Sequence, residues 1–451
     1  MTEIYPEYYE SFCCIADRCE DTCCAGWEID IDDASYDAYM RVGGDLGARL
    51  RACIKTYDAD PDSEENDEYE EVYEQHGFVL TKDMRCPFLD EHNLCDLYKE
   101  LGEDSLCEVC TNTPRNFLEY KAFSDTDGED ANADKARMLR EISVSASCPE
   151  AARLIYGSPE KMRFVEKEIS EDDPISEHGG KYGPSESLEE VDEDEPILGR
   201  FLKNVRADAI DILQNRDNDI NSRIRIFLQH AEGVQKAINA WEAGDKRLPE
   251  RVPVQDMCGG PSDEKEGYVG SEDKSGDVPG KDYAYRHFLI RMGSYSGLAS
   301  IGFAWQEKME ELYDGFVGDE EDETVNDAKN GEFSKIYKKT SDNLIKYLIE
   351  EDRLYEYEHL LVYYAFLLLN RSIDDYDYLG KAKLVVLSYL MNKDMDAAVF
   401  LKKGILSKED REKNARIYAR EVEHAEENLA DLFEEILFER AYDSEGLCAG
   451  L

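Results

Sequence analysis

The stretch that most constrains the fold of this chain is the cysteine-rich segment at residues 12–32, FCCIADRCEDTCCAGWEIDID. It carries Cys13, Cys14, Cys19, Cys23 and Cys24. Thiolates are soft ligands, and several of them brought together by folding bind zinc or an iron–sulfur cluster. Gly26 permits a tight turn at the exit of the loop. The segment therefore predicts that the first part of the chain folds around a metal centre.

Three later segments add cysteines to this set. They are CPFLDEHNLC at residues 86–95, CEVCTNTPRNF at 107–117 and SCPEAARL at 147–154. In a reducing compartment such a pattern favours metal ligation over disulfides. The alternative role of a cysteine is that of a small buried hydrophobic residue. That role is the better interpretation for five of the 13 cysteines, namely Cys13, Cys53, Cys107, Cys258 and Cys448.

The charge of the chain excludes several classes of partner. Lys and Arg number 52 against 103 Asp and Glu, which gives a formal net charge of −51. Such a surface repels the phosphates of nucleic acids and anionic membranes. We therefore expect no nucleic acid and no membrane among the partners, and attribute the acidity mainly to solubility.

The hydrophobic pattern favours a cytoplasmic protein. The opening MTEIYPEYYESFCC has no basic region followed by an apolar run, so it does not resemble a secretory signal. The longest apolar candidate, HLLVYYAFLLLN at residues 359–370, is shorter than the roughly 20 residues that span a bilayer. It predicts a buried helix.

The sequence pattern predicts an α+β protein in which a small cysteine-rich, metal-binding domain precedes a mostly α-helical domain. We expect the cysteine-cluster domain at residues 1–160, an acidic linker at 161–196 and the helical domain at 197–451, with flexible inserts near 253–281 and 317–330. A further acidic stretch, residues 58–74, predicts an exposed loop.

Local patterns predict the elements of the first domain. Alternation at Trp27, Ile29 and Ile31 indicates a strand, and a helix capped by Asp33 or Ser35 should follow and end at Gly43-Gly44. Further expected elements are a hairpin around residues 90–93, a helix interrupted by Pro114, a strand through Ile142, Val144 and Ala146, and a helix after Cys148-Pro149.

Four segments together resemble the flagellin lysine N-methylase family, whose opening domain is related to a wider class of zinc- or iron-chelating proteins. They are CIADRCEDTCCAGWEIDID from Cys14, CPFLDEHNLC from Cys86, CTNTPR from Cys110 and SCPEAARL from Ser147. A weaker match runs through YEHLLVYYAF and REVEHAEENL in the helical half. The resemblance covers the first 155 residues well and the remainder thinly.

The resemblance implies an S-adenosylmethionine-dependent lysine N-methyltransferase that acts on flagellin and carries a [4Fe-4S] cluster, with zinc as the alternative metal. The positions that match the family's cysteines are Cys14, Cys19, Cys23, Cys24, Cys86, Cys95, Cys110 and Cys148. The alternative function belongs to another class: a non-enzymatic zinc-binding protein-interaction module.

Methyl transfer to lysine requires specific chemical groups, and the sequence assigns only a few residues to these roles. The reacting nitrogen must be neutral, while a free lysine has a pKa near 10.4, so the site must desolvate the ammonium or supply a base. No Gly-rich dinucleotide loop is present to hold S-adenosylmethionine. Arg115 is a candidate for binding its carboxylate, with a surface salt bridge as the alternative role. Trp27 fits a pocket wall or the core, and His92 and His424 fit non-ligand roles.

Overall fold

A computed structural model describes residues 1–27, 29–58, 74–124, 136–169, 194–244, 247–253, 283–300, 302–318 and 326–451. Most of the acidic loop at 58–74, of the linker's acidic part and of the insert predicted near 253–281 lies outside these residues, as do Cys258 and half of the insert predicted near 317–330. The domain boundaries expected from the sequence stay a prediction.

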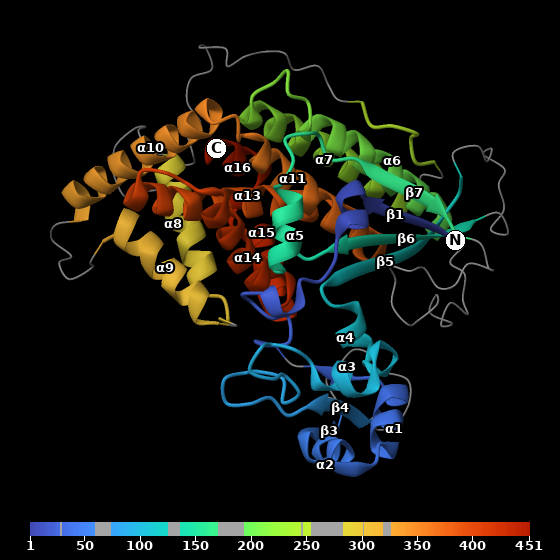
Figure 1. Cartoon of the computed structure of the whole chain (residues 1–451). Helices are drawn as coiled ribbons and strands as arrows, with labels where there is room; N and C mark the ends of the chain where they lie inside the picture. Colours follow the sequence, from blue (N-terminus) through green and yellow to red (C-terminus); the bar gives the residue numbers. More distant parts are fainter. Residues whose placement is uncertain are drawn as a thin grey trace.

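The described residues between 24 and 112 form a small lobe, here called the cysteine lobe, which Figure 1 shows below the rest of the molecule. Its elements are β2 (Asp30–Ile31), α1 (Asp33–Arg41), α2 (Gly44–Cys53), β3 (Ile54–Asp58), β4 (Glu74–Phe78), α3 (Asp96–Leu101) and α4 (Glu108–Asn112). The strands pair antiparallel in the order β2-β4-β3. Tyr39, Leu50, Phe78 and Phe88 form the apolar core of the lobe, together with several cysteines.

A second sheet joins the start of the chain to the region after the lobe. Its strands are β1 (Thr2–Pro6), β5 (Arg115–Ala122), β6 (Arg137–Val144) and β7 (Phe164–Glu168), in the order β5-β6-β1-β7. β1 lies parallel to β6, with Ile4 opposite Glu141, and the other pairs are antiparallel. The short helix α5 (Pro149–Ile155) follows β6 and brings Cys148 to its N-terminus.

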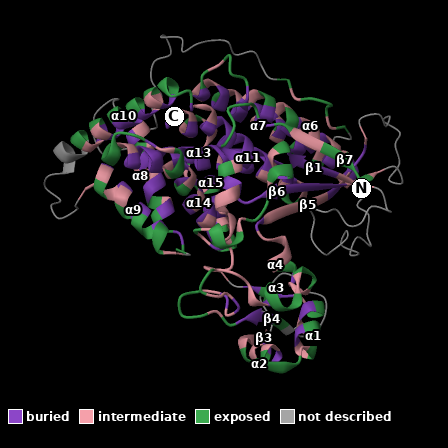
Figure 2. Cartoon of the chain, viewed as in Figure 1, coloured by how far each residue is buried: buried purple, intermediate pink, exposed green. Residues whose placement is uncertain are grey.

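The remainder is a helical body built around α13 (Tyr378–Lys403), which packs against α7, α9, α10, α11, α14 and α15. The other helices are α6 (Glu195–Leu213), α7 (Ile220–Glu242), α8 (Tyr283–Ser296), α9 (Phe303–Phe316), α10 (Asn326–Glu350), α11 (Tyr355–Leu368), α12 (Ser372–Asp375), α14 (Lys408–Glu423), α15 (Glu426–Phe438) and α16 (Ser444–Ala449). Figure 2 shows buried residues concentrated around α11 and α13, whereas the cysteine lobe is mostly intermediate or exposed.

The apolar run at residues 359–370 lies in and just after α11 and is buried, as predicted. No helix in the described part of the chain is long and apolar enough to cross a membrane. The α+β prediction, with a small cysteine-rich region followed by a mostly helical one, is confirmed.

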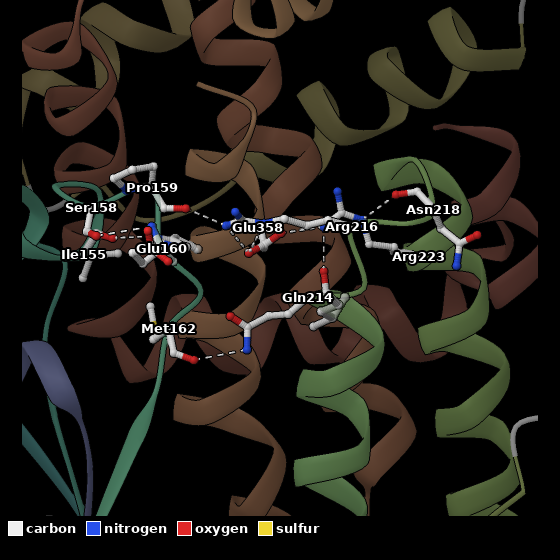
Figure 3. A network of polar contacts seen from close by, with 12 residues as sticks. Ile155, Ser158, Pro159, Glu160, Met162, Gln214, Arg216, Asn218, Arg223 and Glu358 are labelled. Atoms are coloured by element: carbon white, nitrogen blue, oxygen red, sulfur yellow. Dashed lines mark hydrogen bonds and ion pairs between the residues drawn. The ribbon is translucent and has the colours of Figure 1, made fainter. Parts of the chain in front are cut away.

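Buried ion pairs fix the helices to the sheet side of the molecule. Glu358 of α11 accepts hydrogen bonds from Arg216 Nε (2.9 Å to Oε2) and from Arg223 Nη1 (2.7 Å), while Arg216 Nη2 also donates to the carbonyl of Pro159 (2.8 Å). Figure 3 shows this network linking α11, the turn between α6 and α7, and the segment after α5. A carboxylate buried in this way requires such partners, because an unpaired buried charge is costly.

Most local predictions for the first domain are confirmed. The helix ending before Pro114, strand β6 and helix α5 are present, although β6 ends at Val144, before Ala146, and Gly26 has a φ of 99°. The hairpin predicted around residues 90–93 is reduced to a tight turn closed by a single bridge between Leu89 and Cys95. The predicted cap of α1 is wrong by one residue, because Asp32, not Asp33 or Ser35, accepts the hydrogen bond from the Ser35 amide (2.9 Å).

Candidate functional site

The cysteine loop at residues 19–25 is fastened to the end of α14 by Arg420. Arg420 Nη1 donates to Asp21 Oδ1 (3.0 Å), and Nη2 donates to the carbonyls of Thr22 (3.3 Å) and Ala25 (3.2 Å). The same guanidinium lies 5.4 Å from the centre of the Trp27 ring. One side chain of the helical body therefore holds the most cysteine-rich part of the sequence in place.

Four cysteines lie close together where the cysteine loop meets the helical body, and we call them the junction thiols: Cys14, Cys19, Cys23 and Cys148. Burial raises the pKa of Cys19 and of Cys148, and the negative charge of Cys14 would raise both further. The Cys148 sulfur also faces backbone N–H groups at the start of α5, which favour its thiolate.

Six cysteines pack in the core of the cysteine lobe. One is Cys53, and we call the other five the lobe thiols: Cys24, Cys86, Cys95, Cys107 and Cys110. The amide of Cys86 donates to the carbonyl of Cys24 (3.0 Å), and Cys95 pairs with Leu89 across the turn. The hydrogen bond between the Cys107 and Cys110 thiols lowers the pKa of Cys107 and raises that of Cys110.

The adjacent residues Cys23 and Cys24 connect the two groups. Their thiols are hydrogen-bonded, which raises the pKa of Cys23 well above its usual range and lowers the pKa of Cys24 to about 7. Cys23 interacts with the junction thiols Cys14 and Cys148, whereas Cys24 interacts with the lobe thiols Cys86 and Cys95. The eight cysteines singled out by the sequence fall into two groups of four, with Cys107 as a ninth member beside Cys110.

The donor chemistry of both groups fits a thiolate-bound metal, because sulfur ligands predominate and the thiols are unpaired by disulfides. Within the described ranges, however, no three His, Cys, Asp or Glu side chains converge as a ready-made ligand set. The assignment of Cys14, Cys19, Cys23, Cys24, Cys86, Cys95, Cys110 and Cys148 as ligands therefore stays a prediction. Cys448 lies apart, in α16.

Arg115, the candidate for binding the carboxylate of the methyl donor, begins β5 directly after Pro114. Its Nε donates to Tyr9 Oη (3.0 Å), and its guanidinium lies 5.6 Å from the centre of the Phe12 ring. Its Nη1 donates to the carbonyl of Thr111 (3.4 Å), so these partners in the described part of the chain are neutral and include no carboxylate. Arg115 thus borders the cysteine-rich opening, and its role in binding a cofactor stays a prediction.

Beside the junction thiols lies a carboxylate that the sequence reading did not single out. Glu423 ends α14, and its Oε2 accepts hydrogen bonds from Ser145 Oγ (2.7 Å) and Tyr363 Oη (2.9 Å). Its Oε1 accepts one from Tyr364 Oη (3.0 Å). The Ala146 amide donates to Tyr363 Oη (2.9 Å), which fixes that hydroxyl between the backbone and the carboxylate.

His424, the next residue, completes this cluster. Its Nε2 lies 2.8 Å from Ser147 Oγ and 3.1 Å from Ser145 Oγ, and its ring stacks on Trp27 at a centroid distance of 4.7 Å. We call Ser145, Ser147, Tyr363, Tyr364, Glu423 and His424 the acid cluster. Trp27, expected to line a pocket or the core, therefore links the acid cluster to the cysteine loop.

Burial changes the protonation of both titratable residues that end α14. It raises the pKa of Glu423 to about 7, against the opposing hydrogen bonds from Ser145, Tyr363 and Tyr364. It lowers the pKa of His424 to about 4, with a further contribution from Arg420. Near neutral pH, the histidine is therefore neutral, and the carboxyl group is poised to gain or lose a proton.

The acid cluster draws on segments that are far apart in the sequence. Ser147 belongs to SCPEAARL, Tyr363 and Tyr364 to YEHLLVYYAF, and Glu423 to REVEHAEENL. The first is one of the four segments that carry the family resemblance, and the other two are its weaker match in the helical half. Only the weak match at REVEHAEENL pointed to Glu423, because nothing in the sequence pairs it with residues some 280 positions earlier.

Comparison with known proteins adds family information. A model of the FliB lysine N-methylase C-terminal domain matches residues 206–451, which is more than half of the chain. The Lysine-N-methylases of Salmonella choleraesuis (strain SC-B67) and Salmonella typhimurium (strain LT2) are each 28% identical to this chain over 182 residues. The flagellar biosynthetic protein FliU of Salmonella muenchen is 28% identical over 170 residues.

These alignments cover only part of each protein. They span 38% of this chain and 36% of each Lysine-N-methylase, or little more than a third of those relatives. For FliU they span 37% of this chain and 84% of the relative. No solved structure matches the chain.

Proposed function

Because the chain belongs to the FliB lysine N-methylase family, as predicted from its sequence, we propose that it is a protein-lysine N-methyltransferase. The methyl donor would be S-adenosylmethionine, and the acceptors would be lysine side chains of flagellin. The names of the relatives support the lysine chemistry and the flagellar connection. The observation that carries the proposal is the convergence of the family-like segments on one acid cluster beside the junction thiols.

In this proposal the cysteines hold a [4Fe-4S] cluster, and zinc is the alternative. The junction thiols, Cys14, Cys19, Cys23 and Cys148, would bind the group nearest to the acid cluster. A thiolate-bound metal would supply a fixed charge and would order the cysteine loop, since metal binding and folding are coupled. Arg115 would contribute a donor for the carboxylate of S-adenosylmethionine.

The acid cluster supplies what the acceptor nitrogen requires. Amine methylation needs a neutral nucleophile in line with the methyl carbon, and positioning contributes several kcal/mol to such reactions. The hydroxyl groups of Tyr363, Tyr364 and Ser145 converge there in an environment that disfavours charge. Such surroundings favour the neutral form of a lysine amine.

The proposal is tested by incubating anaerobically purified protein with flagellin and S-adenosylmethionine and measuring the intact mass of flagellin. We expect mass increases in steps of one methyl group, located on lysines by peptide mapping. Cys23→Ser should lose bound iron and activity, whereas the matched control Cys448→Ser, which lies in α16, should retain both. A protein that holds zinc, binds no S-adenosylmethionine and leaves flagellin unmodified would instead be the interaction module.

A further inference from the structure

Glu423 has different partners from most of the fully buried carboxylates in the described part of the chain. Five of those carboxylates each bind an arginine: Glu141 binds Arg206, Glu356 binds Arg353, Glu358 binds Arg216 and Arg223, Asp394 binds Arg291, and Asp396 binds Arg411. The described donors to Glu423 are instead neutral: the hydroxyls of Ser145, Tyr363 and Tyr364 and the backbone amide of Ala146.

The cation nearest in sequence is already engaged elsewhere. Arg420 lies one turn earlier on α14, and its Nη atoms bind Asp21 and the carbonyls of Thr22 and Ala25. Glu423 is thus a deeply placed carboxylate whose described partners provide no compensating positive charge. Such a group is costly to keep unless a cation occupies the site during function.

Glu423 and His424 keep some exposed surface, unlike the arginine-bound carboxylates named above. The groups that face Glu423 are Tyr8 from the first 3-10 helix, Tyr156 from the end of α5, Tyr363 and Tyr364 from α11, and Tyr418 from α14. His424 is the next residue, against Ser145 and Ser147, and Arg420 lies one turn earlier. All these groups except Arg420 are neutral near pH 7, so among them Glu423 is the one anion that an ammonium entering the site would meet.

We propose that Glu423 is the catalytic base, which binds the ammonium of the substrate lysine and takes its proton, with Ser145, Tyr363 and Tyr364 positioning the carboxylate. This inference rests on the proposed function. A carboxyl group whose pKa lies near the working pH is well matched to this task. A solvated carboxylate would be too weak a base toward lysine.

The step balances as follows. The Glu423 carboxylate removes one proton from the lysine ammonium, leaving a neutral amine. The nitrogen lone pair forms a bond to the methyl carbon of a sulfonium donor, the carbon–sulfur bond breaks, and its electron pair stays on sulfur as a thioether. The product is a methylammonium, and the proton on Glu423 passes to solvent before the next turnover.

The test compares methylation of flagellin by wild type, Glu423→Gln and Glu423→Asp between pH 5.5 and 9.5. We expect the wild-type rate to rise with pH and level off above about 7. Glu423→Gln should be slower by about 100-fold or more at pH 7, in the range lost with a general base. Its rate should continue to rise toward the pKa of free lysine, near 10.4. Glu423→Asp should regain part of the rate.

Two further measurements separate catalysis from a structural role. Tyr364→Phe removes one hydrogen bond to Glu423 and should shift the acid limb of the pH profile to higher pH, because the carboxylate loses a donor. The cation n-butylammonium, an analogue of the lysine side chain, should bind wild type at pH 8 and bind Glu423→Gln at least tenfold more weakly. Glu427→Gln, on the exposed first turn of α15, is the matched control.

The outcomes are distinguishable. Full activity of Glu423→Gln with an unchanged pH profile would overturn the assignment of the base and leave the proposed methyltransferase intact. An unchanged acid limb in Tyr364→Phe, together with equal binding of n-butylammonium to wild type and Glu423→Gln, would also overturn it. A folded wild-type protein that methylates no lysine on flagellin would overturn the proposed function and this inference together.

Discussion

At Glu423, burial disfavours the ionised carboxylate while the surrounding hydrogen-bond donors favour it. Its carboxylate accepts three hydrogen bonds from hydroxyl groups, yet burial still raises its pKa to about 7. Hydrogen bonds from neutral donors do not fully replace hydration of a charge. The protein therefore retains a group that is unfavourable for stability when ionised, at the junction of its two cysteine-bearing parts.

This conflict predicts a pH dependence of stability. Since the folded pKa of Glu423 lies above its usual 4.5, the folded state binds the proton more tightly than the unfolded state. The contribution of Glu423 to stability is then retained at acid pH, falls between about 4.5 and 7, and levels off above 7 at a loss of about 3 kcal/mol. In Glu423→Gln this pH-dependent loss is absent.

The measurement is the thermal midpoint of Glu423→Gln minus that of wild type, taken from pH 5 to pH 8. The difference should increase with pH as wild type loses the protonated carboxyl group. The same difference for the exposed control Glu427→Gln should stay flat. A constant difference for Glu423→Gln would contradict the raised pKa.

Among the elements, α14 joins the cysteine loop to the helical body. Its N-terminus is closed by a capping box between Ser407 and Asp410, and its C-terminal turn carries Arg420, Glu423 and His424. The hydroxyl groups that meet Glu423 come from α11 and from the turn between β6 and α5. Two helices, one turn and one loop therefore define the site, and α14 contacts the other three.

We predict that Arg420→Ala loosens the cysteine loop from α14. The change removes charge-assisted hydrogen bonds to residues 21–25 and the packing on Trp27, at a local cost of about 1.5–3 kcal/mol. Amide hydrogen exchange of residues 21–27 should speed up about tenfold or more, since 1.4 kcal/mol corresponds to tenfold. Lys413→Ala, an exposed site on the same helix, is the control. Equal exchange in both variants would refute the role of Arg420.

A second element-scale prediction concerns the buried network on α11. Glu358→Ala leaves the Arg223 guanidinium buried without its carboxylate and breaks the bidentate contact with Arg216. Unfolding in urea should show a loss of about 3–5 kcal/mol, as for other broken buried pairs. Glu350→Ala removes an exposed pair with Lys346 and should cost less than about 1 kcal/mol. Similar losses in the two variants would contradict the structural role of Glu358.

At the scale of the whole molecule, the local sequence patterns identified several elements but not how they assemble. Periodicity and turn residues located α1, β6, α5 and the buried α11. They missed that β1 pairs with β6 and β7, because the pairing of Ile4 with Glu141 leaves no local signal. Helix α2 was also missed, since its glycine-rich start, Gly43-Gly44, indicated only the end of α1.

For the candidate site, too, local sequence patterns identified some residues but not how they come together. The cysteine spacing singled out the cysteine-rich region as the candidate site, and the structure adds that the cysteines lie in two groups joined at Cys23 and Cys24. Glu423 was not predicted, because its chemistry arises from desolvation and from hydroxyl groups contributed by distant elements. Such an environment exists only after the chain has folded.

The central claim is that methyl donor and lysine meet where the cysteine loop, the turn between β6 and α5, and the end of α14 converge. Hydrogen exchange of the intact protein with and without S-adenosylmethionine and flagellin tests this location directly. We predict that the ligands slow exchange at residues 21–27, 144–148 and 420–425 together. The contradicting result would be unchanged exchange in these three segments, with protection confined to the cavity of about 540 Å³ between α8 and α16.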